Sequence, residues 1–362
     1  MRSHVRPPRL RLFRPAATTY KVSFGARANS ITTPPSAPPA SPPPAAFQFV
    51  SSYDLFAKRP PRPFPPPFHT PPPSSFSDPL TNHPRERPEG AAFLSGVTNG
   101  DDAILTSPFY LAVADGVGAW NTRSHGHAAL WSRLVLHFWG KELSAGQWGF
   151  RRPEGVDPVR CLQEAYQTTI YATTNAGARG DQVWQGTTTV CGAVLKDRKL
   201  VVLNLGDSVA IVWRKGLKKW LLRTKEQWHW FDCPRQLGTN SPDTPVDNAV
   251  VQEVEVQDGD LVLLATDGLV DNMWDAEILT VITGVMEAGE EEVVKEVGEG
   301  GDQGRMKMLS QRILEGAKKT AIDPFAESPY MERSIEMGLG IEGGKWDDIS
   351  VVAAVCRPTE SG

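Results

Sequence analysis

Apolar residues recur along this chain in short runs rich in β-branched side chains, a pattern typical of buried strands. The segment 47–53 alternates apolar and polar residues and predicts a first strand. Further strands are predicted at 109–114, 187–195, 199–205, 208–214, 250–256, 260–266 and 348–355. Short polar turns, such as 196–199 and 214–216, join some of these runs and indicate antiparallel hairpins.

Helical periodicity, with apolar residues three to four positions apart, is found in a smaller number of segments. These segments are 126–143, 158–177, 275–287 and 305–319. The Glu-rich segment 288–302 is expected to be a solvated excursion, and Asn121 and Thr122 are expected to cap the helix that follows them. Hairpins combined with a few long helices favour an α+β domain with antiparallel sheets over a doubly wound parallel sheet.

The beginning of the chain differs in charge from the rest. Residues 1–53 contain six Arg, one Lys and no acid, which gives +7; the whole 362-residue chain carries −4, so the remainder carries −11. An Arg-rich, acid-free start without a continuous apolar core predicts a mitochondrial transit peptide over residues 1–30, with a disordered basic tail as the alternative. The expected location is therefore the mitochondrion, in the matrix.

Proline marks the segments around the first predicted strand. A Pro/Ala/Ser linker is predicted at 31–45, and a Pro-rich inserted loop at 58–90, because such runs cannot pair inside a sheet. The folded domain is predicted to span 46–358. No stretch approaches the ~20 apolar residues that cross a bilayer, so no transmembrane span is expected. The acidic body argues against a nucleic-acid partner, and a monomer is expected.

Aspartates recur in short segments, most of them directly after apolar runs. The segments are 100–103, 111–118, 203–208, 263–268 and 346–350. A carboxylate at the end of a buried strand is costly unless a cation meets it, and clustered carboxylates without one are driven to protonate. Most of these segments have no Lys or Arg beside them, so a site for divalent metal is predicted. Two Mg²⁺ or Mn²⁺ ions ~3.5–4 Å apart can share a water that becomes hydroxide and attacks phosphorus.

In their order along the chain, these motifs resemble those of the metal-dependent type-2C (PPM) serine/threonine protein phosphatases. The motifs are Asp101-Asp102, 114–118, 186–188, 204–208, 265–269 and 347–350, and the similarity runs from about residue 46 to the C-terminus. The segments 226–231 and 323–326 are similar to the mitochondrial branch of that family. The resemblance implies a four-layer α/β/β/α sandwich of two antiparallel β-sheets flanked by helices, with metals in a cleft at one edge.

The resemblance also implies a role for each matched residue. Asp115 bridges two Mn²⁺ or Mg²⁺ ions, and the carbonyl of Gly116 binds one of them. Asp267 and Asp347 complete the protein ligands of the first ion. Asp101 binds the second ion, directly or through water.

Three further aspartates follow from the same resemblance. Asp207 joins Asp267 around a third, weaker ion, while Asp102 and Asp348 orient metal-bound water. Asp115, Asp267 and Asp102 are thus the candidate catalytic residues. The implied activity is metal-dependent hydrolysis of phosphoserine and phosphothreonine in phosphorylated mitochondrial proteins, without a covalent phosphoenzyme.

The chain departs from the family pattern at three positions. Asp101 stands where members commonly have Glu, and Val117 stands where many have a His proposed as general acid. Val97 stands where many have a phosphate-binding Arg. Another group must then supply these functions, and a metal-bound water, Arg123 and His229 are candidates.

Two other functions remain open. A pseudophosphatase, acting as a binding module, would explain the three departures, although degenerate members usually lose the aspartates that this chain retains. A haloacid dehalogenase-type phosphatase would need a second Asp two residues from Asp267, but Ala265 and Leu269 occupy those positions.

Overall fold

The computed structural model describes residues 46–60, 62–65, 68, 95–144, 155–175, 184–196, 198–217 and 219–359. All of them fall within one unit of the chain, Pro44–Gly362. The predicted transit peptide at 1–30, the linker at 31–45 and most of the Pro-rich loop at 58–90 lie outside the described residues. They remain predictions.

The first sheet joins the two ends of the folded unit. Its five strands follow the order β1-β15-β14-β8-β9, and each is antiparallel to its neighbour. Their bounds are β1 (Phe47–Phe56), β15 (Ile349–Pro358), β14 (Leu261–Ala265), β8 (Val209–Trp213) and β9 (Leu222–Arg223). Phe56 pairs with Ile349, and Ala265 with Val351. The end of β1, the end of β14 and the start of β15 therefore lie side by side at one end of the strands.

The second sheet brings three other segments to one end of its strands. Its six strands follow the order β13-β7-β6-β4-β3-β2, all antiparallel. Their bounds are β13 (Val250–Glu255), β7 (Lys199–Leu205), β6 (Val190–Lys196), β4 (Tyr110–Ala114), β3 (Asp102–Thr106) and β2 (Ser95–Asn99). Ala103 pairs with Ala114, and Leu205 with Val190. This register places the start of β3 beside the end of β4, with the end of β7 two strands away.

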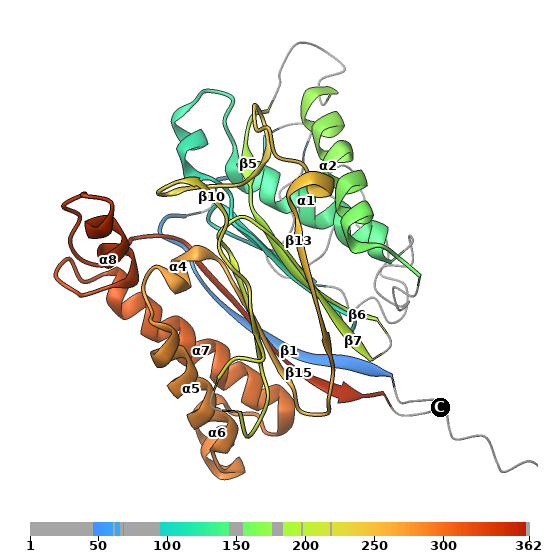
Figure 1. Ribbon diagram of the computed structural model, residues 1–362, viewed down its shortest axis with the longest axis vertical. Helices are drawn as coiled ribbons and strands as arrows, with labels where there is room; N and C mark the ends of the chain where they lie inside the picture. The colour runs from blue at the N-terminus through green and yellow to red at the C-terminus, as the bar shows by residue number, and fades with distance from the viewer. Residues whose placement is uncertain are drawn as a thin grey trace, which may run out of the picture. The chain divides into compact units, whose positions relative to one another are not determined.

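Helices cover the outer faces of the two sheets (Figure 1). Helix α1 (Ala128–Leu143) packs on β3 and α2 (Pro158–Asn175) packs on α1, whereas α7 (Gly301–Ala321) packs on β1 and β15, with α5 (Asp275–Glu287) against it. Along β15, Val351 and Ala353 belong to the apolar cluster on the α7 side, whereas Val352 and Ala354 belong to the cluster between the sheets. This alternation confirms the predicted α/β/β/α sandwich.

Small elements lie around this sandwich. They are the 3₁₀ helix η2 (Gly118–Thr122), α3 (Pro245–Asn248), α4 (Asp267–Val270), α8 (Pro329–Glu336), β5 (Thr187–Thr188), β10 (Trp228–Trp230), β11 (Cys233–Pro234) and β12 (Leu237–Gly238). Strands β2 and β3, and helix α8, had no counterpart in the sequence prediction. No helix among the described residues is both long and apolar enough to cross a membrane.

The segment 288–302, expected to be a solvated excursion, is largely exposed, but most of it is helical and not irregular. It forms α6 (Glu290–Val297) and the first residues of α7. Glutamates fill the first turn of α6, where they interact favourably with the helix dipole, and Gly298 ends the helix with a positive φ of 74°. Val293 is buried and Val297 is partly buried against the same apolar cluster, so two apolar residues fix this otherwise solvated helix to the domain.

The cap of α1 also differs from the prediction. His127 is the N-cap residue, and its Nδ1 accepts a hydrogen bond from the Leu130 N–H at 3.2 Å. Asn121 and Thr122 lie in η2, five or more residues upstream. The predicted caps are therefore wrong, and Asn121 contributes to a different site.

Candidate metal centre

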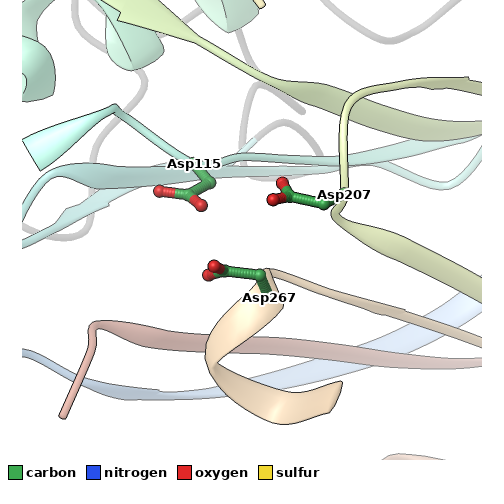
Figure 2. A group of neighbouring side chains, drawn as sticks. All are labelled: Asp115, Asp207 and Asp267. Atoms are coloured by element: carbon green, nitrogen blue, oxygen red, sulfur yellow. The ribbon is translucent and has the colours of Figure 1, made fainter. Parts of the chain in front are cut away.

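Three of the predicted aspartates converge where strand ends of the two sheets meet. Asp115 follows β4, Asp207 follows β7 and Asp267 begins α4 directly after β14. Each offers one carboxylate oxygen, and these three atoms lie within 4.8 Å of one another. Figure 2 shows the three carboxylates pointing into a common space. The structure thus brings together residues that lie up to 152 positions apart in the sequence.

The oxygens of this cluster suit a divalent cation. The Oδ1 atoms of Asp207 and Asp267 are buried and have no hydrogen-bond partner. A buried carboxylate oxygen without a partner is costly, and a metal ion is one of the groups that can satisfy it. Because the donors are carboxylates, they suit Mg²⁺ or Mn²⁺ better than a metal that prefers thiolates. The residues present therefore fit the expected ions.

The electrostatics of the cluster lead to the same conclusion. Burial raises the pKa of Asp115 well above its ordinary value, and the Asp267 and Asp102 carboxylates raise it further. Burial and Asp267 likewise raise the pKa of Asp207. Burial disfavours the ionised form of Asp267 as well, but the Lys345 ammonium outweighs it and lowers the pKa of Asp267 to about 2. The carboxylates repel one another, and a bound cation would relieve that repulsion.

Asp102 and Asp348 are held by hydrogen bonds behind this cluster. Asp102 Oδ2 accepts from Thr266 Oγ1 at 2.9 Å and from Ser350 Oγ at 2.8 Å. Asp348 Oδ2 accepts from the Asp101 N–H at 2.9 Å. These bonds link the start of β3 in one sheet to the ends of β14 and β15 in the other, so both carboxylates help to fix the position of the site.

Asp101 and Gly116 lie against each other on the other side of Asp115. A Cβ atom at Gly116 would come within 2.3 Å of the Asp101 carbonyl oxygen, so only glycine allows this close approach. Asp101 Oδ2 accepts from Asn121 Nδ2 at 2.7 Å and also from the Arg59 guanidinium. Asp101 therefore lies beside Asp115 in the fold, but the Asp101 carboxylate is paired with the Arg59 guanidinium.

Asp347 is paired in a similar way. The Lys58 ammonium bonds to Asp347 Oδ1, and Lys345 Nζ lies 3.5 Å from Asp347 Oδ2. The main-chain N–H of Lys58 also donates to Asp348 Oδ1 at 2.7 Å. Among the described residues, the group whose oxygens converge consists of Asp115, Asp207 and Asp267, while Asp101 and Asp347 border it.

Sequence reasoning missed the cations of this site. Lys58 and Arg59 follow β1, whose last residue pairs with the first residue of β15. This register brings Lys58 to Asp347, and the next residue, Arg59, reaches Asp101 just before β3 of the other sheet. Lys345 is only two residues from Asp347 in sequence, so it could have been noticed. For Lys58 and Arg59 the only signal would have been the pairing of the first strand with the last, which no local pattern reveals.

The two side chains considered as substitutes for the missing family residues have other partners. The Arg123 guanidinium lies 5.0 Å from the centre of the Trp120 ring. His229 Nε2 lies 2.7 Å from Asp243 Oδ2. Val97 is buried between the two sheets. The position of the family's usual phosphate-binding Arg therefore cannot contribute to the site in this chain.

A family model and several known phosphatases are similar to this chain. The family model described as Protein phosphatase 2C matches residues 95–297. Probable protein phosphatase 2C 80 of Arabidopsis thaliana is 32% identical over 260 residues, which cover 71% of this chain and 54% of that protein. The chain thus spans about half the length of this relative. Protein phosphatase PTC7 homolog of Homo sapiens is 30% identical over 275 residues, covering 72% of this chain and 80% of that protein.

A solved structure supports the same assignment. The X-ray structure of the photosystem II phosphatase PBCP matches with a TM-score of 0.54 and 25% identity, over 85% of this chain and 98% of that one. Its fold agreement adds to the sequence matches and to the convergence of the matched aspartates at one sheet edge. The chain therefore belongs to the protein phosphatase 2C family of metal-dependent serine/threonine protein phosphatases.

Proposed function

We propose that this protein hydrolyses phosphoserine and phosphothreonine in mitochondrial proteins with the help of two Mn²⁺ or Mg²⁺ ions. The observation that carries the proposal is the convergence of three carboxylates, two of which have buried oxygens without a hydrogen-bond partner. When bound, the ions supply a Lewis acid that lowers the pKa of the attacking water and neutralises charge on the phosphoryl group.

The residues of the chain then have distinct tasks. Asp115 would bridge the two ions, with Asp267 and Asp347 holding the first and Asp101 and the Gly116 carbonyl holding the second. All five lie where strand ends of the two sheets meet. Oxygen ligands of this kind suit hard divalent ions that keep several waters.

Asp102 and Asp348 would act on the position of these ligands and of the attacking water. Asp102 is 1% exposed and held by two hydroxyl groups, so its carboxylate cannot turn away from the cluster. Asp348 accepts N–H bonds from both Asp101 and Lys58. It therefore fixes a proposed metal ligand and a cation at the same time.

Lys58 and Arg59 are the residues that we propose to bind the phosphate of the substrate. A Cβ atom built on Gly118 would lie 3.5 Å from Asp101 Oδ2, 3.6 Å from Lys58 Nζ and 3.7 Å from Arg59 Nη2, so all these groups border one space. The Arg59 side chain is 41% exposed and can change partner when a phosphate arrives. A planar guanidinium binds phosphate through two parallel hydrogen bonds, which makes it a suitable replacement for the Arg that the family has at Val97.

The proposed mitochondrial location is supported by the composition of residues 1–30, which are rich in Arg and free of acids. A fluorescent fusion of the full chain should localise to mitochondria, and a fusion that lacks residues 1–30 should not. Retention of the full-length fusion in the cytosol would contradict the location without affecting the proposed chemistry.

The activity itself can be tested with phosphoserine and phosphothreonine peptides. Hydrolysis should require Mn²⁺ or Mg²⁺, stop in a chelator and fall more than about 100-fold in Asp267→Asn, because a charged ligand becomes a neutral one. Hydrolysis that persists in the chelator would contradict metal-dependent chemistry. Absence of hydrolysis with every divalent ion tested would favour a pseudophosphatase.

A further inference from the structure

The two cations that we propose to bind phosphate lie on a short segment after β1, residues 58–60 and 62–64, which we call the cationic segment. Its first two residues pair with carboxylates of the site. Its last residue, Phe64, is only 6% exposed and packs in the apolar cluster to which α1 contributes. Between these ends, Arg62 is exposed, so its hydrogen bonds compete with water. The segment is thus anchored at the carboxylates and again beside α1.

A single imidazole joins the cationic segment to α1. His127 Nε2 lies 3.0 Å from the Pro63 carbonyl oxygen, and His127 Nδ1 accepts from the Leu130 N–H at 3.2 Å. Because the main-chain N–H can only donate and the carbonyl can only accept, the ring is neutral and carries its proton on Nε2. The His127 ring also meets the Phe64 ring edge-on, with 5.5 Å between their centres. His127 therefore contacts the segment and the start of the helix at the same time.

The surroundings of the imidazole favour this neutral form. His127 is 2% exposed, and burial lowers its pKa, although the hydrogen bond to the Pro63 carbonyl partly opposes this effect. A second ring proton would sit on Nδ1 and face the Leu130 N–H, which is also a donor. Both hydrogen bonds of the ring therefore form together only when the ring is neutral.

The cap alone does not account for a histidine at this place. Ser, Thr, Asp and Asn are the usual N-cap residues, and their short side chains end at the cap. His127 caps α1 with one ring nitrogen and uses the other to hold the segment. The same helix also holds the partner of Arg59, because Ser132 Oγ donates to the Asp101 carbonyl at 2.6 Å. Joining the segment to α1 therefore fixes Arg59 relative to Asp101.

We propose that His127 is a positioning residue, which holds Lys58 and Arg59 where the phosphate of the substrate binds by joining the Pro63 carbonyl to the start of α1. The rings of Pro60 and Pro63 fix their φ angles, so a shift at Pro63 is passed along the segment to Arg59. This inference rests on the proposed function, because that function assigns the phosphate to these two cations. It adds the residue that keeps them in place.

Two substitutions separate the two hydrogen bonds of the imidazole. His127→Asn should keep the cap, because Asn is a good N-cap residue, but its short side chain should lose the bond to Pro63. His127→Gln is the matched variant, because its longer side chain retains an amide N–H that can donate to Pro63 while Gln is not a preferred N-cap residue. His127→Ser also caps and cannot reach Pro63, so it replaces His127→Asn if that variant does not fold.

Phosphate inhibition and hydrogen exchange are measured on these variants. In His127→Asn, the inhibition constant for inorganic phosphate and the KM for a phosphopeptide should rise about 2-fold to 10-fold, the range expected for one lost neutral hydrogen bond. The kcat should change less, and the number of bound Mn²⁺ ions should stay the same. Amide exchange in the cationic segment should become faster without metal or substrate. His127→Gln should leave phosphate inhibition close to wild type and lower the Tm.

A double substitution tests whether the effect passes through Arg59. In an Arg59→Ala background, His127→Asn should raise the phosphate inhibition constant by a smaller factor than in wild type, because one of the cations that it positions is gone. Equal factors in the two backgrounds would overturn the proposed role of His127.

The remaining outcomes separate this inference from the proposed function. A folded His127→Asn with either phosphate inhibition or segment exchange unchanged would overturn the role of His127 and leave the proposed activity standing. Equal rises of the phosphate inhibition constant in His127→Asn and His127→Gln would do the same, because the cap would then be the cause. A wild-type protein that neither binds phosphate nor hydrolyses phosphopeptides with any divalent ion would overturn both.

Discussion

The two cationic sides of the carboxylate cluster differ in how they are built. On one side, Lys58 and Arg59 follow the end of β1; the Lys58 side chain is 19% exposed, but the Arg59 side chain is 41% exposed. On the other side, Lys345 is 17% exposed, and Asn272 holds its backbone through two hydrogen bonds. An exposed side chain can change partners when substrate binds, whereas a buried and anchored one stays in place. We therefore expect Arg59 to bind substrate and Lys345 to have a permanent structural role.

The largest expected effect is a loss of folding stability in Lys345→Gln in the absence of metal. Removing one partner from buried ion pairs leaves uncompensated carboxylates, which typically costs about 3–5 kcal/mol. Urea unfolding in a chelator should show a loss of about 3 kcal/mol, and Mn²⁺ should restore part of it. Lys345→Arg should lose less. If Lys345→Gln were as stable as wild type in the chelator, Lys345 would not balance the cluster.

The pH dependence of the metal-free protein provides a second test. Burial raises the pKa of Asp271 to about 7 and that of Asp348 to about 6, from an ordinary value of 3.8. The folded chain then retains protons that the unfolded chain has released, so the free energy of unfolding should fall as the pH rises from about 4 to about 7.

Urea midpoints measured across this range in a chelator should therefore decrease with rising pH. Mn²⁺ should reduce the decrease, because it binds the ionised carboxylates and displaces their protons. A midpoint that rises with pH in the chelator would show that the raised pKa values are wrong in sign.

On the exposed side, Arg59→Ala should mainly weaken substrate binding. The loss of charge-assisted hydrogen bonds to a phosphate, on the order of 1.5–3 kcal/mol, corresponds to about a 10-fold to 100-fold decrease in kcat/KM. The inhibition constant for inorganic phosphate should rise in parallel, while the number of bound Mn²⁺ ions stays the same.

Arg62→Ala is the matched control for this variant. Arg62 lies on the same segment but donates to Asn121 Oδ1 and the Gly126 carbonyl, and not to a carboxylate. It should change phosphate inhibition much less. Equal effects of the two substitutions would mean that Arg59 acts only by holding the segment in place.

The smallest effect is expected at Asn121. Its side chain donates to Asp101 Oδ2 at 2.7 Å, so Asn121→Ala removes a bond that orients a proposed ligand. Losses of this kind typically weaken metal affinity by about 10-fold or somewhat more. Mn²⁺ titration should reveal a weaker second ion and an unchanged first ion, and an unchanged isotherm would exclude this role for Asn121.

The sequence predicted an α+β domain with antiparallel sheets because strand and helix periodicities are local properties, whereas the four-layer sandwich was implied by the family resemblance. The strands at 199–205 and 260–266 agree with β7 and β14 to within one residue at either end. The short strand β2 was missed because few apolar residues precede the Asp101-Asp102 turn, and β3 was missed because the apolar run after that turn, 103–105, is only three residues long. Helix α6 was missed because only Val293 and Val297 pack on the apolar cluster, which leaves little apolar periodicity to detect.

The candidate site was predictable to a similar degree. The aspartates could be named because each follows an apolar run, and the convergence of Asp115, Asp207 and Asp267 was expected from the resemblance. Lys345 could have been noticed beside Asp347, but Lys58 and Arg59 could not be named, because their proximity depends on pairing between the first and last strands. Their presence also corrects the assumption, made from neighbouring residues in the sequence, that few protein cations meet these carboxylates.

The most direct test of the central claim is Mn²⁺ binding by wild type and by Asp115→Asn, measured by calorimetry on the metal-free proteins. Asp115 is proposed to bridge both ions, so its substitution should weaken the binding of both together. The account predicts two ions on wild type and a loss of affinity for each in Asp115→Asn. Two ions bound with unchanged affinity by Asp115→Asn would contradict it.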